Sequence, residues 1–176
     1  MKNWKKFSKS TSVYFPKKIN KFLTLSKKKL EFIKKNKNLV NLKSRICSHT
    51  SNKDKIHEMF IFHKKGAYVR PHRHINKLES FLLISGKATI IFFDNNGKPK
   101  QVIKMGNYSS GITFYYKIFK SFFHTVIIEK DVLFQEVTSG PFIKKKTIYA
   151  KWSPEEKNVE EVKNYLLKLK KIANRS

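Results

Sequence analysis

The chain has 176 residues, enough for one domain with a terminal extension, and 40% of them are hydrophobic, which excludes an intrinsically disordered chain. Lysine and arginine outnumber aspartate and glutamate by 39 to 12, which gives a formal net charge of +27. Only four of the 39 basic residues are arginine, the residue that makes most bidentate contacts with phosphates and bases. We therefore do not expect a nucleic-acid partner. Codon bias at tolerant surface positions is one explanation of the lysine excess, and a functional basic surface is the alternative.

The sequence lacks both a cysteine pair and a long apolar segment. Its single cysteine, Cys47, cannot form an internal disulfide, which is typical of a protein in a reducing compartment. Lysines interrupt every candidate signal peptide near the N-terminus, and the longest apolar run, Ala88–Phe93, is far too short to span a membrane. We expect a cytoplasmic protein without a membrane span.

Residues 1–44 form a basic arm with one helical pattern, at Ser26–Asn36. Ser26 is a candidate N-cap, and Leu30 and Ile33 give this helix a short apolar face. The other residues of the arm are rich in lysine and serine and have no regular apolar period. We expect part of the arm to be disordered.

A different pattern, short β-rich runs separated by turn signals, begins near Ile56 and continues to Val137. The hairpin signal Asp94–Gly97 separates two of these runs, and no helical crossover lies between any of them, so we expect antiparallel sheets in a sandwich or barrel. The predicted strands are His57–Phe62, Ala67–His74, Glu79–Ile84, Ala88–Phe93, Gln101–Met105, Ile112–Ile118, His124–Ile128 and Val132–Val137.

The C-terminal region, residues 153–176, predicts a helix. It begins with Ser153-Pro154-Glu155-Glu156, in which Ser153 would cap the helix and Glu156 would complete a capping box. Apolar residues follow at helical spacing: Val159, Val162, Leu166, Leu169 and Ile172. We expect this helix to pack on the β-domain, residues 45–152, or on a second subunit.

The segment Gly66–Gly86 carries the residues that point to chemistry. His72 and His74 lie two apart on a predicted strand, so both imidazoles project from the same face and can reach one ion. Glu79 is five residues further on, an odd offset, so the chain must turn after His74 and deliver Glu79 from the next strand. With its two terminal glycines the spacing matches the first cupin motif, and this resemblance implies an antiparallel cupin barrel, also called a double-stranded β-helix or jelly roll.

A fourth ligand should come from a distant strand, because a barrel brings such strands together. His124 stands where the second cupin motif places its histidine, although Phe119, Ser121 and Ile128 occupy the usual proline, glycine and asparagine positions. Three imidazoles and one carboxylate suit a divalent ion such as Fe, Zn, Mn or Ni. They would leave coordination positions free for substrate or oxygen, as in a catalytic site.

Two further residues are candidates for acid–base chemistry. Tyr68 shares strand parity with His72, as does Arg70, so it would line the same cavity unless Pro71 distorts the strand. Glu136, on the last predicted strand, is the other candidate, with a surface position as the alternative.

A longer stretch, about residues 45–156, resembles the WbuC-type cupin-fold metalloproteins. The matching pieces are Arg45–His49, Asp54 with His57–Met59, Gly66–His74, Lys77–Phe81, Phe93–Asp94 with Gly97, His124–Val126, Glu136–Phe142 and Trp152–Glu156. Genes of this family tend to lie among those for surface polysaccharides such as O-antigen. The resemblance therefore implies a sugar or nucleotide-sugar as the small-molecule substrate, without a defined reaction.

We expect a metal-dependent cupin enzyme, with the ion acting as a Lewis acid. The alternatives are an iron-dependent dioxygenase, a metal-free epimerase or isomerase that uses barrel histidines as acids and bases, and a non-catalytic cupin that binds a small ligand. Cupins commonly pair through outer strands or terminal segments, so we expect a homodimer.

Overall fold

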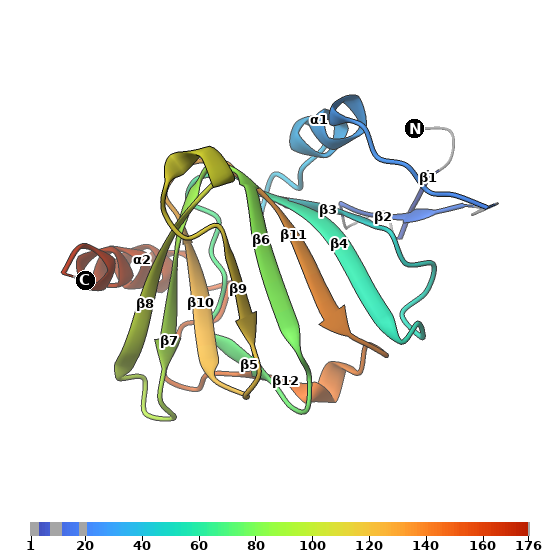
Figure 1. Ribbon diagram of the computed structural model, residues 1–176. Helices are drawn as coiled ribbons and strands as arrows, with labels where there is room; N and C mark the ends of the chain where they lie inside the picture. Colours follow the sequence, from blue (N-terminus) through green and yellow to red (C-terminus); the bar gives the residue numbers. More distant parts are fainter. Residues whose placement is uncertain (1–3, 8–11, 18–20, 176) are drawn as a thin grey trace.

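The computed structural model describes residues 4–7, 12–17 and 21–175, and its centre consists of two β-sheets that face each other (Figure 1). Within these residues the larger sheet contains, in spatial order, β1 (Trp4–Lys6), β2 (Val13–Pro16), β3 (Lys43–Cys47), β4 (Ile56–His63), β11 (Val132–Ser139), β6 (Glu79–Ser85) and β9 (Tyr115–Ile118). The smaller sheet contains β12 (Thr147–Tyr149), β5 (His72–His74), β10 (Phe123–Ile128), β7 (Lys87–Phe93) and β8 (Pro99–Gly106). Two α-helices, α1 (Lys27–Lys35) and α2 (Val159–Asn174), and two 3₁₀ turns (Tyr108–Ser110 and Lys144–Lys146) complete the described structure.

The expected antiparallel architecture is confirmed, with one exception. Among the described strands only β2 and β3 pair in parallel. Two predicted strands are also shorter than expected, because β5 contains only His72–His74 and β9 only Tyr115–Ile118. Pro71 explains the first difference, since proline has no N–H to donate to a neighbouring strand.

The N-terminal arm has more regular structure than its sequence predicts. β1 and β2 form a hairpin that extends the larger sheet beyond β3. Trp4 and Phe15 are each 6% exposed, so burial of aromatic side chains stabilises strands whose lysines gave no alternating pattern. Part of the expected disorder concerns residues 1–3, 8–11 and 18–20, which lie outside the described residues.

Helix α1 covers the outer face of the larger sheet. Its buried residue Ile33 packs with Ile46, Phe62 and Leu133 from three strands of that sheet. The Ser44 hydroxyl donates to the Ile33 carbonyl at 2.7 Å, which satisfies an acceptor in the last turns of the helix. Ser26 occupies the N-cap position as expected, but its side chain makes no capping hydrogen bond.

The space between the sheets holds the main hydrophobic core. Alternate residues of each strand point into it, and the aromatic ring of Phe81 stacks between Phe134 at 4.0 Å and Tyr116 at 5.3 Å between ring centroids. This stack links β11, β6 and β9, and it fixes the half of the sheet from which Glu79 projects.

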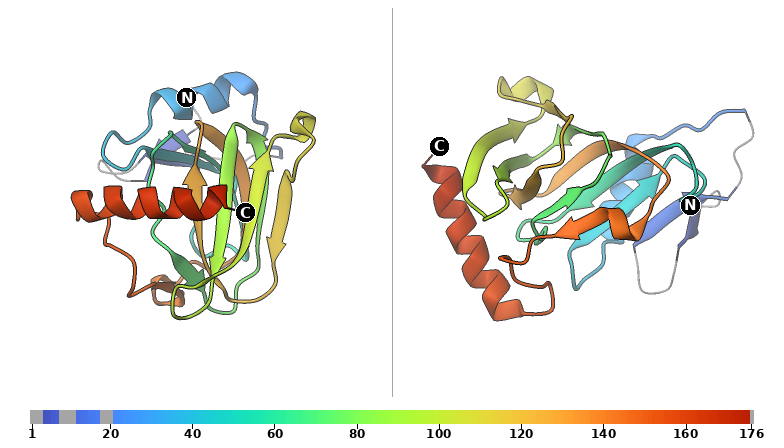
Figure 2. Two further views of the ribbon diagram at one scale, coloured as in Figure 1. Left: turned by 90° about the vertical axis from the view of Figure 1, so that its left-hand side faces the viewer. Right: turned by 90° about the horizontal axis from the view of Figure 1, so that it is seen from below.

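Helix α2 covers the outer face of the smaller sheet, and Figure 2 shows it lying across these strands. The helix begins at Val159 after Asn158, so the predicted capping box at Ser153–Glu156 is wrong. Tertiary contacts occupy that segment instead: the Ser153 hydroxyl donates to the Ala150 carbonyl at 2.9 Å, and Tyr68 donates to the Pro154 carbonyl at 3.0 Å. These bonds anchor the turns that precede the helix.

The two sheets are joined at one end of their edge strands β8 and β9 and are separate at the other end. Met105 in β8 forms a bridge with Thr113, just before β9. From that point β8 and β9 diverge, which leaves one side of the jelly roll open. The fold is therefore not a closed barrel.

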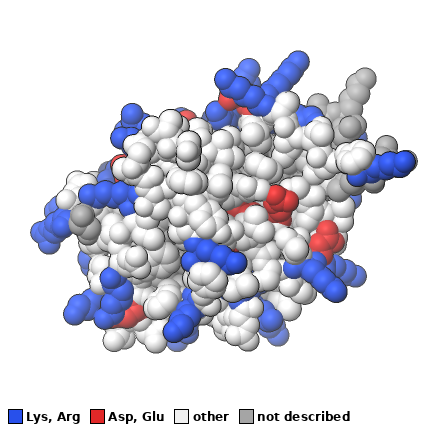
Figure 3. Space-filling model, in the orientation of Figure 1, with Lys and Arg blue, Asp and Glu red and all other residues white. Residues whose placement is uncertain are grey.

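Positive charge is spread widely over the surface. In Figure 3 lysine and arginine side chains surround the visible face of the molecule, and few acidic side chains appear there. Such a distribution favours attraction of anions in general over recognition at one basic patch. No helix within the described ranges has the length and apolar character needed to cross a membrane.

Candidate metal centre

Three histidines converge on the inner side of the smaller sheet. His72 and His74 stand two apart on β5, and His72 is directly opposite His124 on the neighbouring strand β10. One nitrogen from each of the three rings lies within 4.8 Å of the others. Strand parity and register therefore produce the cluster that the sequence predicted.

Glu79 reaches the same point from the opposite sheet. After His74 the chain turns through Asn76, which has a positive φ of 51°, and Glu79 is then the first residue of β6. Its two carboxylate oxygens lie 3.3 Å from Nε2 of His74 and 3.5 Å from Nε2 of His124. The turn explains how an odd sequence offset brings Glu79 to the histidines.

Each ring is oriented by a partner at its other nitrogen. Nδ1 of His72 donates to the Arg70 carbonyl at 2.8 Å, and Nδ1 of His124 donates to the Phe122 carbonyl at 3.1 Å. Nδ1 of His74 lies 3.1 Å from the hydroxyl of Thr147 on β12. Because carbonyl oxygens only accept, the rings of His72 and His124 carry a proton on Nδ1, and their Nε2 atoms face the cluster.

Burial and mutual interactions shift the pKa values of His72, Glu79 and His124. Burial, and then the neighbouring His124 and His74, lowers the pKa of His72 to about 3, so this ring is neutral at physiological pH. Burial alone would raise the pKa of Glu79, but hydrogen bonds from His124 and His74 lower it below its usual value. Burial opposes a charge on His124 as well, yet its hydrogen bond with Glu79 raises the pKa of this histidine.

The donor set fits a divalent metal ion. Imidazole nitrogens and a carboxylate are the ligands that Zn, Fe, Mn and Ni accept, and hydrogen bonds behind the rings are what metal-bound histidines require. Ligands about 2.1 Å from an ion lie up to ~4.2 Å apart, so small side-chain shifts would close a cluster that spans 4.8 Å. His72, His74, Glu79 and His124 could therefore hold one ion.

The two predicted acid–base residues lie in different places. Glu136 is on the inner face of β11, beside a cavity of about 270 Å³ that Lys77 also lines, and Lys77 lines the small cavity at the histidines too. Burial, and then the charge of Glu79, raises the pKa of Glu136 to about 8. Glu136 is half-buried, with its side chain lining this cavity.

Tyr68 is directed elsewhere. Its hydroxyl donates to the Pro154 carbonyl, and its ring meets that of Tyr165 edge-on, at 6.3 Å between centroids. The expected shared parity with His72 fails because the residues from Ala67 to Pro71 form no strand. This hydroxyl holds the C-terminal segment, and Glu136 is the better placed of the two candidates.

Two residues of this region were missed by the sequence analysis. Thr147 orients His74 from β12, a strand too short to produce a recognisable pattern. Tyr116 lies in a groove of about 410 Å³ beside the cluster, and nothing in the sequence distinguishes it from the other aromatic residues of β9.

Comparisons with known proteins identify the fold. The solved structure of the capsular polysaccharide assembling protein CapF from Staphylococcus aureus has a TM-score of 0.50 and 20% identity to this chain, covering 64% of it and 33% of CapF. A cupin superfamily protein from Desulfitobacterium hafniense has a TM-score of 0.45 and 15% identity, covering 56% of this chain and 78% of that protein. An oxalate decarboxylase from Bacillus subtilis, which has Mn(II) centres, has a TM-score of 0.43 and 18% identity, covering 55% of this chain and 24% of that enzyme.

The chain shares with CapF a mainly β fold of two facing sheets. It spans about a third of the length of CapF. A family model described as a domain of unknown function, DUF6016, matches residues 30–105. None of the curated proteins matches the sequence.

Proposed function

We propose that this chain is a metal-dependent cupin enzyme that acts on a sugar or nucleotide-sugar in the biosynthesis of a surface polysaccharide. One observation carries the proposal: three histidines and Glu79 converge, while other partners engage Nδ1 of each ring. The resemblance to WbuC-type cupins and the fold shared with CapF support the choice of substrate class. The proposal includes a cytoplasmic location and a homodimer. Light scattering would measure the mass of the dimer.

His72, His74, Glu79 and His124 would hold one divalent ion. When bound, this ion supplies Lewis-acid chemistry toward a carbonyl or hydroxyl group. Glu79 contributes the negative charge that offsets the ion, and the two opposed sheets keep its carboxylate against His74 and His124. The hydrogen bonds at Nδ1 keep the rings from rotating away.

Glu136 is the proposed acid–base residue. A carboxyl group with a pKa of about 8 is largely protonated at pH 7, so it can donate a proton to a substrate oxygen and later accept one. Lys77 lines both its cavity and the histidine cavity, which supports a role for Glu136 beside the centre. Tyr68 is a weaker candidate because its hydroxyl is already bonded.

Metal quantification tests the centre. Protein purified without chelator should contain about one ion per chain, and the variants His72→Ala and His124→Ala should lose most of it. His63→Ala is a matched control, because His63 is a buried histidine outside the cluster. Full metal content in both ligand variants, or none of Fe, Zn, Mn and Ni in the wild type, would refute the proposed centre.

Turnover tests the acid–base assignment. A nucleotide-sugar that binds in a thermal-shift screen is followed by NMR with wild-type protein and with Glu136→Gln. We expect the variant to keep its metal and lose turnover by about 100-fold or more, the usual contribution of a general acid–base group. Unchanged turnover in Glu136→Gln would remove this residue from the mechanism.

A further inference from the structure

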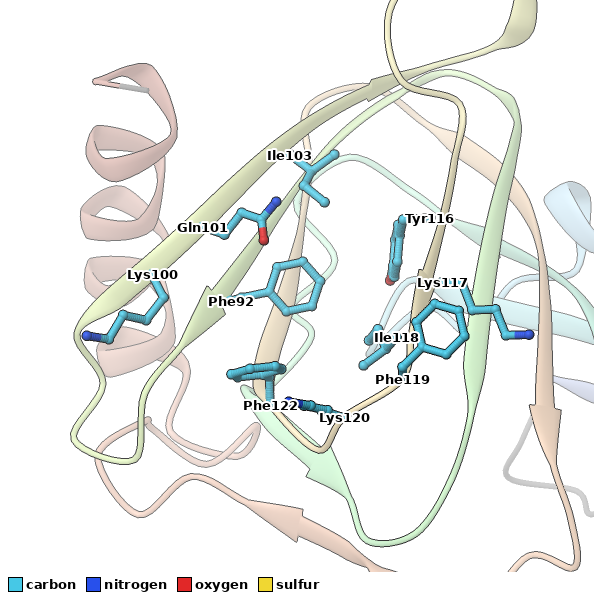
Figure 4. A pocket seen from close by; sticks show the side chains of 10 residues that line it. All are labelled: Phe92, Lys100, Gln101, Ile103, Tyr116, Lys117, Ile118, Phe119, Lys120 and Phe122. Atoms are coloured by element: carbon cyan, nitrogen blue, oxygen red, sulfur yellow. The ribbon is translucent and has the colours of Figure 1, made fainter.

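A groove lies at the open side of the jelly roll, where β8 and β9 diverge (Figure 4). It has a volume of about 410 Å³, within the range of small-molecule sites. Three of its lining residues, Ile118, Lys120 and Phe122, also line the small cavity that contains His74 and His124. The groove and the histidine cavity are therefore adjacent, with these three side chains between them.

Tyr116 gives this groove a polar group without a partner. The residue is only 7% exposed, and its hydroxyl makes no hydrogen bond within the part of the chain that the structure describes. Its ring lies between Phe81, stacked at 5.3 Å, and Phe92, edge-on at 5.9 Å, and neither of these rings offers an acceptor. In Figure 4 the hydroxyl points along the groove toward Ile118.

An unpaired buried hydroxyl is costly, and folded proteins keep few of them unless a ligand or water completes the hydrogen bond. Burial, and then the charges of Glu79 and Glu136, raises the pKa of Tyr116 well above its usual value, so the hydroxyl stays protonated and can donate. A ligand oxygen in the groove would satisfy it.

The walls and rim of the groove define the rest of the ligand. Phe92 and Ile103 form an apolar wall, and Phe119 and Phe122 remain 72% and 45% exposed at the mouth. The rim carries three lysines, Lys100, Lys117 and Lys120, of which Lys100 pairs with Asp94 at 3.7 Å. Exposed aromatic rings beside cations suit a flat apolar group attached to an anion.

We propose that this groove binds an organic anion with a flat ring, whose phosphate or carboxylate group lies against the lysines and whose oxygen accepts a hydrogen bond from Tyr116. The ring packs on the phenylalanines at the mouth, and the far end of the molecule points to the histidines. This inference deepens the proposed function, since it names the chemical class of the substrate and the residues that select it. Nucleotides belong to this class.

Calorimetric titration with UDP, uridine and inorganic diphosphate tests the inference on the full-length protein. UDP should bind more tightly than either of its parts, because only UDP offers both the ring and the anion. Tyr116→Phe removes one hydroxyl and should weaken UDP binding about tenfold. Tyr115→Phe is the control, because Tyr115 lies outside this groove and is 46% exposed.

Thermal unfolding supplies a second readout. Without nucleotide, Tyr116→Phe should melt no lower than the wild type, because the hydroxyl has no protein partner to lose. With saturating UDP it should show a smaller stabilisation than the wild type. Lys117→Gln with Lys120→Gln should weaken UDP binding and reduce its dependence on salt.

Three results would overturn the inference: no binding of any probe, uridine binding as tightly as UDP, or equal UDP affinity of Tyr116→Phe and wild type. The last result would mean that water alone satisfies the hydroxyl. Metal content measured on the same samples separates this inference from the proposed function. A groove that binds UDP through Tyr116 in a protein without metal would keep the inference and reject the metal enzyme.

Discussion

The hydroxyl of Thr147 provides a test of how the metal centre is built. It lies 3.1 Å from Nδ1 of His74, and replacing Thr147 with valine removes the hydroxyl while keeping the shape of the side chain. A neutral hydrogen bond contributes about 0.5–1.5 kcal/mol, roughly 2- to 13-fold in a binding constant. Hydrogen bonds behind metal-bound histidines typically change affinity ~10- to 100-fold. We therefore expect Thr147→Val to bind Zn²⁺ ~10-fold more weakly than the wild type.

Competition with a chromophoric chelator at fixed pH measures this affinity. Thr89→Val is the matched control, because the Thr89 hydroxyl donates to Glu129 and the side chain lies on β7 outside the cluster. The control should bind Zn²⁺ as the wild type does. If Thr147→Val binds within twofold of the wild type, the hydroxyl does not orient His74, and the argument from Nδ1 partners fails for this ring.

Three further predictions concern the fold. Cys47 is 1% exposed, and burial raises its pKa to about 12. Iodoacetamide at pH 8 should therefore modify this thiol only after the protein unfolds, as followed by mass spectrometry. Rapid modification of the native protein would contradict the burial of Cys47. Leu169→Ala should lower the free energy of unfolding, measured by urea titration, by about 2–5 kcal/mol, because Leu169 is buried. The control Leu167→Ala, at a site 53% exposed, should lower it by under ~0.5 kcal/mol. Equal losses in the two variants would mean that α2 does not pack as described. Gly86→Ala should lower the melting temperature more than Gly111→Ala does. A Cβ at Gly86 would lie 2.1 Å from a backbone carbonyl oxygen, whereas a Cβ at Gly111 would meet nothing within 4 Å. Comparable melting temperatures of the two variants would argue against that close approach.

Most of the cupin core could be predicted from the sequence because its determinants are local. The run Ala88–Phe93 became β7 almost unchanged, since apolar side chains on both faces are buried there. The convergence of His72 and His74 with Glu79 also follows from local rules: strand parity places the two rings together, and a turn corrects the offset of the carboxylate. Short-range geometry was sufficient for these features.

Features that depend on distant partners could not be predicted. β2 is a strand because the edge of β3 offers it hydrogen bonds, and β1 pairs in turn with β2. Trp4 and Phe15 are buried in these strands, which no pattern in the lysine-rich arm reveals. Ser153 has the sequence of a helix cap, but its hydroxyl donates to the Ala150 carbonyl and accepts from Nε of Arg70. Tyr116 is distinctive only because its hydroxyl lacks a partner, a property of the packed structure alone.

The open side of the jelly roll links the excess of lysine to the site. β8 and β9 are edge strands, and unpaired edges tend to associate with other chains unless charged side chains oppose it. Lys100 and Lys104 on β8 and Lys117 on β9 provide such charges beside the grooves of this side. Because Lys100 and Lys117 also line the groove beside the histidine cavity, the charge that keeps the edges apart also attracts anions to that groove. Codon bias can therefore account for how many lysines the chain has, while the position of these three follows from the fold.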